Sequence, residues 1–219
     1  MNDYMIQGIL MDGYEFLALA VPFFVLFVIM RGKRQKGEKD GASCLAASAV
    51  FLIYLWGVFH FTGAGTIWEP VRYGMSGGAF RQEEINLIPF SLGIDPVGYG
   101  LNVVLFLPFG FLLPFLWKET DSLRKTAAGG FMLSLLIELS QLLNNRSTDI
   151  DDLILNTAGA VLGYGAFRLL DLISGGKIRG RLSGRLIRRM GPVLFIAAAF
   201  LGRFFFFDEM GAAGFLYGF

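Results

Sequence analysis

The chain has 219 residues, of which 54% are hydrophobic and only 17% are charged. This composition is far from that of a soluble globular domain and is typical of a protein that crosses a membrane several times. The net charge of +1 gives no support for binding to nucleic acid, and the single cysteine, Cys44, excludes an intramolecular disulfide.

Six stretches of the sequence are long and apolar enough to be transmembrane helices. A helix needs about 20 mostly apolar residues to cross the hydrocarbon of a bilayer. In chain order, the stretches are residues 14–30, 42–61, 97–117, 125–143, 151–172 and 192–207. The leader before the first stretch carries Asp3, Asp12 and Glu15 and no basic residue, which is not typical of a cleavable signal. We therefore predict an all-α fold class, a polytopic membrane helical bundle with about six transmembrane helices.

The helices divide the chain into three parts. Residues 1–83 hold two helices with a basic connection between them and a long external loop after them, residues 84–172 hold a core of three helices, and residues 173–219 hold a second basic connection and the last helix.

Basic residues gather in three connections, which follow the first, third and fifth helices. They are Arg31, Lys33, Arg34, Lys36, Lys39, Lys118, Arg124, Lys125, Lys177, Arg179, Arg181, Arg185, Arg188 and Arg189. The other connections carry only Arg72, Arg81 and Arg146, so the positive-inside rule predicts that both termini are extracytoplasmic. The last basic connection could also rest on anionic membrane lipids, although an ordinary cytoplasmic loop is the simpler interpretation.

The predicted helix 125–143 carries a polar stripe at its outer end. Ser134, Glu138 and Gln141 fall at positions i, i+4 and i+7 and therefore share one face. A carboxylate at membrane depth costs about 2.5 to 3.5 kcal/mol on insertion scales. Glu138 therefore needs a partner or a purpose, and Arg146 in the following turn is the obvious partner.

The next helix carries a second polar stripe on the other side of a short turn. Asp149, Asp152 and Asn156 recur at spacings of three and four residues, and the small residues Gly159 and Gly163 continue the same face. Such spacing lets a neighbouring backbone approach closely. We expect that neighbour to be helix 125–143, which would join the two stripes into one pocket. Carboxylates at a helix start also have an ordinary structural role as caps.

A third wall of this pocket is predicted from helix 97–117. Asn102 lies in the outer part of that helix, which Pro108, Gly110 and Pro114 interrupt. Because an amide inside a membrane bundle needs a partner, we expect Asn102 to face the polar cluster. Asn86, at the end of the long external loop, lies close to the membrane surface and could help to cap the pocket.

The order of these motifs resembles the VanZ-like family of bacterial membrane proteins. The motifs are NLIPF, then N and PFG in one helix, then S...E..Q....R..D..D...N..G...G, and they run from about residue 84 to residue 165. The matching residues are Asn86, Pro89, Asn102, Pro108, Gly110, Ser134, Glu138, Gln141, Arg146, Asp149, Asp152, Asn156, Gly159 and Gly163. The resemblance implies a small multi-pass protein of the bacterial cytoplasmic membrane. In some members it implies lowered susceptibility to glycopeptide antibiotics with lipid tails, such as teicoplanin.

We therefore predict an outward-facing polar pocket that recognises an amphiphilic ligand of the cell envelope. This ligand would be a lipoglycopeptide antibiotic, a lipid-linked glycan or wall precursor, or a sugar-bearing lipid. The candidate ligand-binding residues are Glu138, Gln141, Arg146, Asp149, Asp152, Asn156, Asn102 and Asn86. No cofactor and no metal is expected for this function.

The alternative is a membrane enzyme that acts on a lipid-linked substrate. Glu138 would be its general base, or Glu138, Asp149 and Asp152 would gather Mg²⁺. The sequence favours recognition over catalysis, because His60 is the only histidine and DIDDLILN lacks the second aspartate motif of membrane prenyl and phosphatidyl transferases. Transport is favoured less, since only one predicted helix is broken.

Overall fold

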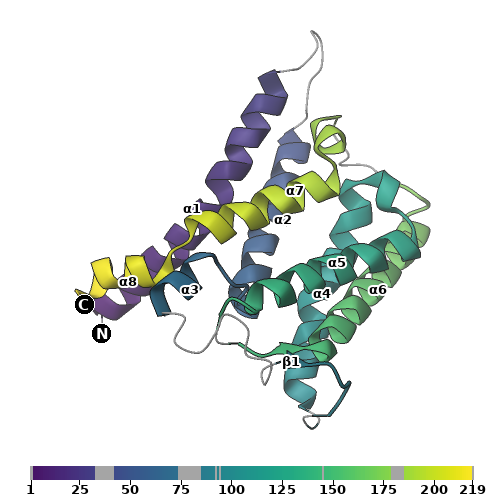
Figure 1. The fold of residues 1–219 in the computed structure, drawn as a ribbon. Helices are drawn as coiled ribbons and strands as arrows, with labels where there is room; N and C mark the ends of the chain where they lie inside the picture. The colour runs from purple at the N-terminus through teal and green to yellow at the C-terminus, as the bar shows by residue number, and fades with distance from the viewer. Residues whose placement is uncertain are drawn as a thin grey trace.

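The computed structural model describes residues 2–32, 42–73, 85–91, 93, 95–144, 146–178 and 185–218. These parts of the chain form eight α-helices, one 3₁₀ turn and one pair of very short strands (Figure 1). The elements are α1 (Asn2–Gly32), α2 (Ala42–Thr62), α3 (Trp68–Tyr73), β1 (Ile85–Asn86), α4 (Pro96–Leu116), η2 (Lys118–Thr120), α5 (Leu123–Gln141), β2 (Thr148–Asp149), α6 (Ile150–Ile173), α7 (Arg185–Phe206) and α8 (Glu209–Tyr217). The predicted all-α fold class is confirmed. Lys33, Arg34, Lys36, Lys39, Arg81, Arg179 and Arg181 of the predicted basic and external loops lie outside the described residues.

The protein is a multi-pass membrane protein. Within the described residues, four stretches are long and apolar enough to cross a membrane: Tyr4–Met30, Leu45–Thr62, Pro96–Leu116 and Ile150–Ile173. A fifth is formed if Met190–Phe206 and Glu209–Tyr217, which meet at an angle of 48°, are one span. The predicted count of six is not confirmed, because α5 is too polar to satisfy the same test. Its charged residues Arg124, Lys125 and Glu138, together with Gln141, lower its hydropathy.

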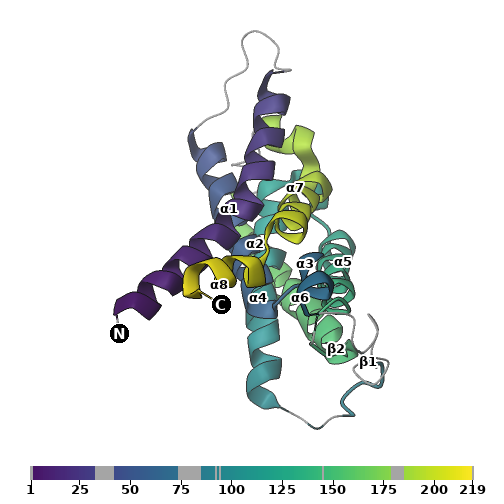
Figure 2. The same cartoon turned by 60° about the vertical axis from the view of Figure 1, so that its left-hand side comes forward.

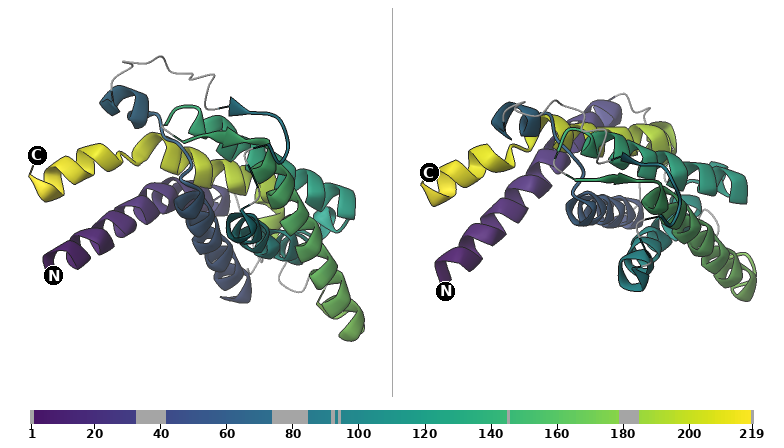
Figure 3. Two further views of the ribbon diagram at one scale, coloured as in Figure 1. Left: turned by 90° about the horizontal axis from the view of Figure 1, so that it is seen from below. Right: turned by 60° about the horizontal axis from the view of Figure 1, so that its bottom comes forward.

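Helix α1 begins earlier than predicted, because the acidic leader is part of the helix. Its 31 residues correspond to about 46 Å, which exceeds the hydrocarbon thickness of a bilayer. The N-terminal half lies beside α8 (Figure 2), and the Gln7 amide donates to the Leu216 carbonyl at 3.1 Å. The two described chain ends consequently lie on the same side of the molecule (Figure 3).

Helices α4 and α6 make the closest backbone contact in the bundle. A Cβ atom added to Gly159 would lie 2.3 Å from the Val103 carbonyl oxygen, and one added to Gly163 would lie 2.0 Å from the Leu107 carbonyl oxygen. The expected close approach is therefore present, but its expected partner was wrong: the glycine face packs on α4 rather than on α5. Helix α5 contacts α6 on a different face, where Gly130 lies against Ala160.

A cluster of buried aromatic rings joins this core to the last long helix. Phe51 of α2, Trp117 after α4 and Phe195 of α7 have centroid separations of 5.3 to 5.5 Å. Ring pairs at such distances add to the stability that their burial provides. Helix α7 reaches this cluster after a break at Gly191, where φ is 64° and Pro192 follows.

Candidate functional site

Side chains from α2, α4, α5 and α6 line one cavity where α4 and α6 begin and where α2 and α5 end. The cavity has a volume of about 590 Å³. The predicted residues that line it are Asn102, Glu138, Gln141, Arg146, Asp152 and Asn156. We call it the core cavity. The structure thus brings six of the eight predicted side chains together.

Asn102 and Asp152 face each other across this cavity. The Asn102 amide of α4 donates a short hydrogen bond to the Asp152 carboxylate in the first turn of α6. Asn102 therefore points at the cluster, as expected. Because Tyr99 and Asp95 at the start of the same helix also line the cavity, its α4 wall is polar at the N-terminal end of α4.

The Glu138 carboxylate is hydrogen-bonded to a backbone amide and not to Arg146. Its side chain is 4% exposed, and its Oε2 atom accepts a hydrogen bond of 3.1 Å from the Asp149 amide nitrogen. Arg146 donates instead from Nη1 to the Thr62 carbonyl oxygen at 2.9 Å. In the described part of the chain no ion pair joins the two side chains, so the expected partner was wrong. Arg146 does interact electrostatically with both Glu138 and Asp152.

Gln141 and Asn156 are buried amides that each lack one partner. Gln141 donates from Nε2 to the Thr62 carbonyl oxygen at 2.7 Å, and Asn156 donates from Nδ2 to the Ser134 hydroxyl at 2.9 Å. Their amide oxygens, Oε1 and Oδ1, have no hydrogen-bond partner among the described residues. Unsatisfied buried acceptors are uncommon in proteins.

Asn86 and Asp149 lie next to the core cavity but do not line it. They are paired in register in the parallel strands β1 and β2, and the Asn86 amide donates to the Asp149 carboxylate at 3.2 Å. Asp149 also caps α6 by accepting from the Asp151 amide nitrogen at 3.0 Å. Both residues therefore hold the end of the segment that precedes α4 on the start of α6.

Asp151 fixes the same loop and was not among the predicted residues. It is 1% exposed, and its carboxylate accepts from the Phe90 amide nitrogen at 2.8 Å and from the Tyr99 hydroxyl at 2.6 Å. The only sequence signal for it was the second aspartate in the run DIDD, which is also ordinary at a helix start.

The turn that follows α2 supplies the backbone groups to which the α5 end is attached. The Gly63 carbonyl accepts from the Asn144 amide at 3.0 Å, and the Gly65 amide nitrogen donates to the Ser140 hydroxyl at 2.9 Å. Gly63 has φ of +62°, and a Cβ atom there would lie 2.0 Å from Nη1 of Arg146. Glycine is therefore required for the turn and for the position of Arg146.

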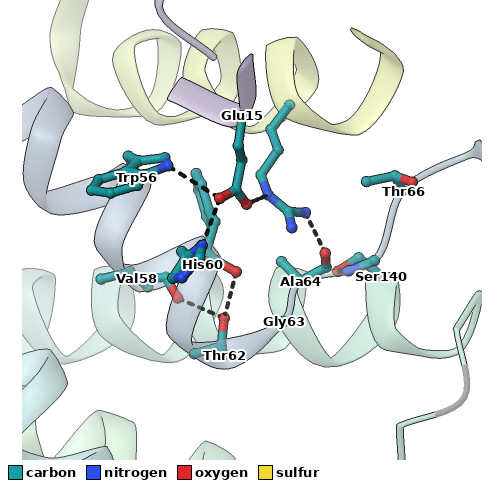
Figure 4. Close-up of polar contacts among 12 residues, drawn as sticks. Glu15, Trp56, Val58, His60, Thr62, Gly63, Ala64, Thr66 and Ser140 are labelled. Carbon is teal, nitrogen blue, oxygen red and sulfur yellow. Dashed lines mark hydrogen bonds and ion pairs between the residues drawn. The ribbon is translucent and has the colours of Figure 1, made fainter. Parts of the chain in front are cut away.

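A second polar cluster, which was not predicted from the sequence, lies on the other side of this turn (Figure 4). Glu15 of α1 and Arg203 of α7 are 2% and 5% exposed and form an ion pair at 2.7 Å. His60 and Trp56 of α2 also contact the Glu15 carboxylate, at 2.7 and 3.1 Å. Arg203 Nη1 donates to the Ala64 carbonyl oxygen. The available signal was an isolated arginine inside the apolar run LGRFFFF.

Within the described chain, no group of three or more His, Cys, Asp or Glu side chains is arranged to hold a metal ion. The alternative in which Glu138, Asp149 and Asp152 gather Mg²⁺ therefore has no such arrangement among the described residues. The Asp149 carboxylate instead accepts hydrogen bonds from the Asn86 amide and, as the cap of α6, from the Asp151 amide nitrogen.

Comparisons with known proteins agree with the motif resemblance. The family model described as VanZ/LLP1 matches residues 49–171, which is more than half of the chain. Protein VanZ of Enterococcus faecium is 37% identical over 91 residues, which cover 41% of this chain and 56% of that protein. The chain thus matches little more than half the length of this relative. No solved structure matches significantly.

The family match begins within α2 and so extends further toward the N-terminus than the motifs do. The geometry gives a reason, because the turn after α2 supplies the carbonyl that holds both Gln141 and Arg146. The chain belongs to the VanZ-like family.

Proposed function

We propose that the protein recognises an amphiphilic ligand of the bacterial cell envelope in the core cavity. A lipoglycopeptide antibiotic and a lipid-linked glycan or wall precursor are the ligands of this class that we favour. The observation that carries the proposal is that charged and amide side chains of α4, α5 and α6 line one cavity together. Binding of this kind would contribute to glycopeptide resistance if the antibiotic itself is the ligand.

The cavity wall is suited to a molecule with both a polar and an apolar part. Glu138, Asp152 and Arg146 can contact a polar head group, while Phe61 and Leu101 also line the cavity. These two apolar side chains are 72% and 63% exposed. A hydrocarbon tail can therefore continue from the cavity along the outside of α2 and α4 into the lipid.

The proposal places the core cavity on the extracytoplasmic side of the cytoplasmic membrane, with both termini on that side. In a variant whose native Cys44 is replaced by alanine, cysteines at Ser76 and Asn145 should react with an impermeant thiol reagent added to intact cells. A cysteine at Gly176 should react only after the cells are opened. Ser76 and Asn145 lie outside the described residues, and Gly176 follows the end of α6. Labelling of Gly176 alone in intact cells would reverse the orientation.

The binding proposal is tested with Glu138→Gln. Glutamine keeps the shape of the side chain and an oxygen that can accept from Asp149, but it removes the charge. We expect the affinity of the purified protein for teicoplanin to fall by about tenfold, the effect of losing one charged hydrogen bond. Glu119→Gln, at an exposed carboxylate of η2, is the matched control and should bind as the parent does.

Two further measurements separate recognition from its alternatives. A glycopeptide without a lipid tail should bind more weakly than teicoplanin if the tail lies along α2 and α4. Conversion of a lipid-linked precursor by the parent, lost in Glu138→Gln and sensitive to a chelator, would instead identify the enzyme. Equal teicoplanin affinity of the parent and Glu138→Gln would contradict the assigned site.

A further inference from the structure

A second cavity lies on the other side of the turn that follows α2. Its volume is about 500 Å³, and its walls come from α1, the end of α2, α3, α7 and α8. The charged side chains that line it are Asp12, Glu15, Glu69, Arg146, Arg203 and Glu209. We call it the terminal cavity. Of these residues only Arg146 also lines the core cavity.

Two guanidinium groups that line this cavity, those of Arg146 and Arg203, have N–H donors without a hydrogen-bond partner among the described residues. Arg203 uses Nε for Glu15 and Nη1 for Ala64, and its Nη2 atom has no partner among the described residues. Arg203 is buried, with 5% of its surface exposed, and it lines the terminal cavity. The Arg146 side chain makes one hydrogen bond, to Thr62. Paired guanidinium groups with free N–H donors suit the oxygens of a phosphate group.

Three carboxylates that line the same cavity, those of Asp12, Glu69 and Glu209, form no ion pair within the described parts of the chain. Glu69 accepts a hydrogen bond from the Thr66 amide nitrogen at 2.8 Å and also interacts with Asn144 and with the Arg203 guanidinium. Burial raises the pKa of Glu69, and the neighbouring Glu209 carboxylate adds to that rise. An ammonium group between Glu69 and Glu209 would offset both effects.

The surroundings of the cavity indicate that its ligand comes from the membrane. The N-terminal half of α1 and helix α8, which form two of its walls, expose large apolar side chains next to it. Ile9 is 64% exposed, Leu10 is 53% exposed and Phe215 is 89% exposed. In a multi-pass membrane protein, such residues beside a charged cavity place lipid tails outside and lipid head groups at its mouth.

We propose that the terminal cavity binds a zwitterionic group in which a phosphate is linked to a primary ammonium, as in the head group of phosphatidylethanolamine. The phosphate contacts Arg146 and Arg203, and the ammonium contacts Glu69 and Glu209. This site shares Arg146 with the core cavity, but its acidic residues lie outside that cavity. It gives the N-terminal and C-terminal helices, which lie outside the matched family region, a role in lipid binding.

The test measures binding of three lipids with identical acyl chains to the delipidated protein in detergent. Phosphatidylethanolamine offers both charges and N–H donors, phosphatidylcholine has a quaternary ammonium without N–H donors, and phosphatidylglycerol has no cation. We expect phosphatidylethanolamine to bind about tenfold more tightly than either of the others. Free phosphoethanolamine, tested in parallel, distinguishes a soluble source from a lipid. If free phosphoethanolamine binds as tightly as the lipid, the phosphate and ammonium contacts stand and the ligand is a soluble compound.

The double variant Glu69→Gln and Glu209→Gln should abolish the preference for phosphatidylethanolamine while keeping teicoplanin binding. Glu138→Gln should weaken teicoplanin binding and keep the preference for phosphatidylethanolamine. Failure of one proposal is therefore distinguishable from failure of the other. Glu119→Gln is the control and should alter neither. If the double variant does not fold, the single variants Glu69→Gln and Glu209→Gln replace it, and each should weaken the preference. Equal binding of the three lipids, or a preference that survives in the variants, would overturn the assignment.

Discussion

Replacing Gly163 with alanine should destabilise the protein by about 3 kcal/mol or more, at the upper end of the range for overpacked cores. The added methyl carbon would lie 2.0 Å from the Leu107 carbonyl oxygen and 3.0 Å from the Phe111 amide nitrogen. Both neighbours are backbone atoms of α4, so no side-chain rotation can make room. Helices α4 and α6 would have to separate along their shared length, and dispersion contacts along that interface would be lost.

Gly165, two residues further along α6, provides a matched control. A Cβ atom built there has no neighbouring atom within 4 Å, and alanine is the better helix former. Gly165→Ala should therefore be neutral or slightly stabilising. Thermal unfolding of the two purified variants in the same detergent measures the difference. If Gly163→Ala were as stable as the parent, α6 would not pack against the backbone of α4.

Periodicity predicted much of the core cavity because its residues lie on regular helices. The spacing of Glu138 and Gln141 on α5, and of Asp152 and Asn156 on α6, is enough to place each pair on one face. A short turn makes these helices neighbours, which brings the two faces together. The direction of the Asn102 side chain was predicted because an amide inside a membrane bundle needs a hydrogen-bond partner.

Periodicity could not predict which helix each face would contact. Gly159 and Gly163 signal a close approach without naming the partner, and α4 rather than α5 is that partner. The position of Arg146 depends on a backbone carbonyl in the turn after α2, 84 residues away. Carbonyls are present at every residue, so no sequence pattern marks the one that will accept.

The Glu15–Arg203 pair was missed for a related reason. Its members are separated by 188 residues, and each taken alone has an ordinary explanation. Glu15 ends an acidic leader, and Arg203 interrupts an apolar run by a single residue. A charge buried inside a membrane helix does indicate that a counter-charge exists. Only the fold identifies which helix supplies it.

Arg203→Met should destabilise the protein by about 3 to 5 kcal/mol, because it leaves the Glu15 carboxylate buried without its counter-charge. Methionine keeps the length and the apolar contacts of the arginine stem. The Trp56 and His60 hydrogen bonds remain, but the Ala64 carbonyl loses its donor. On the α7 side the segment after α2 would then keep the Ile67 to Phe204 backbone hydrogen bond but lose the contact at Ala64.

The double variant Glu15→Gln and Arg203→Met separates the charge from the packing. Replacing a buried ion pair as a unit is often close to neutral, whereas breaking it is not. We therefore expect the double variant to recover most of the stability that Arg203→Met loses. Asp208→Asn is the comparison, because Asp208 pairs with Arg72, whose side chain is 45% exposed, and exposed pairs contribute little. Thermal unfolding of the parent, Glu15→Gln, Arg203→Met and the double variant gives the coupling between Glu15 and Arg203. A double variant that is less stable than Arg203→Met would show that the Glu15 carboxylate stabilises the bundle through Trp56 and His60 instead.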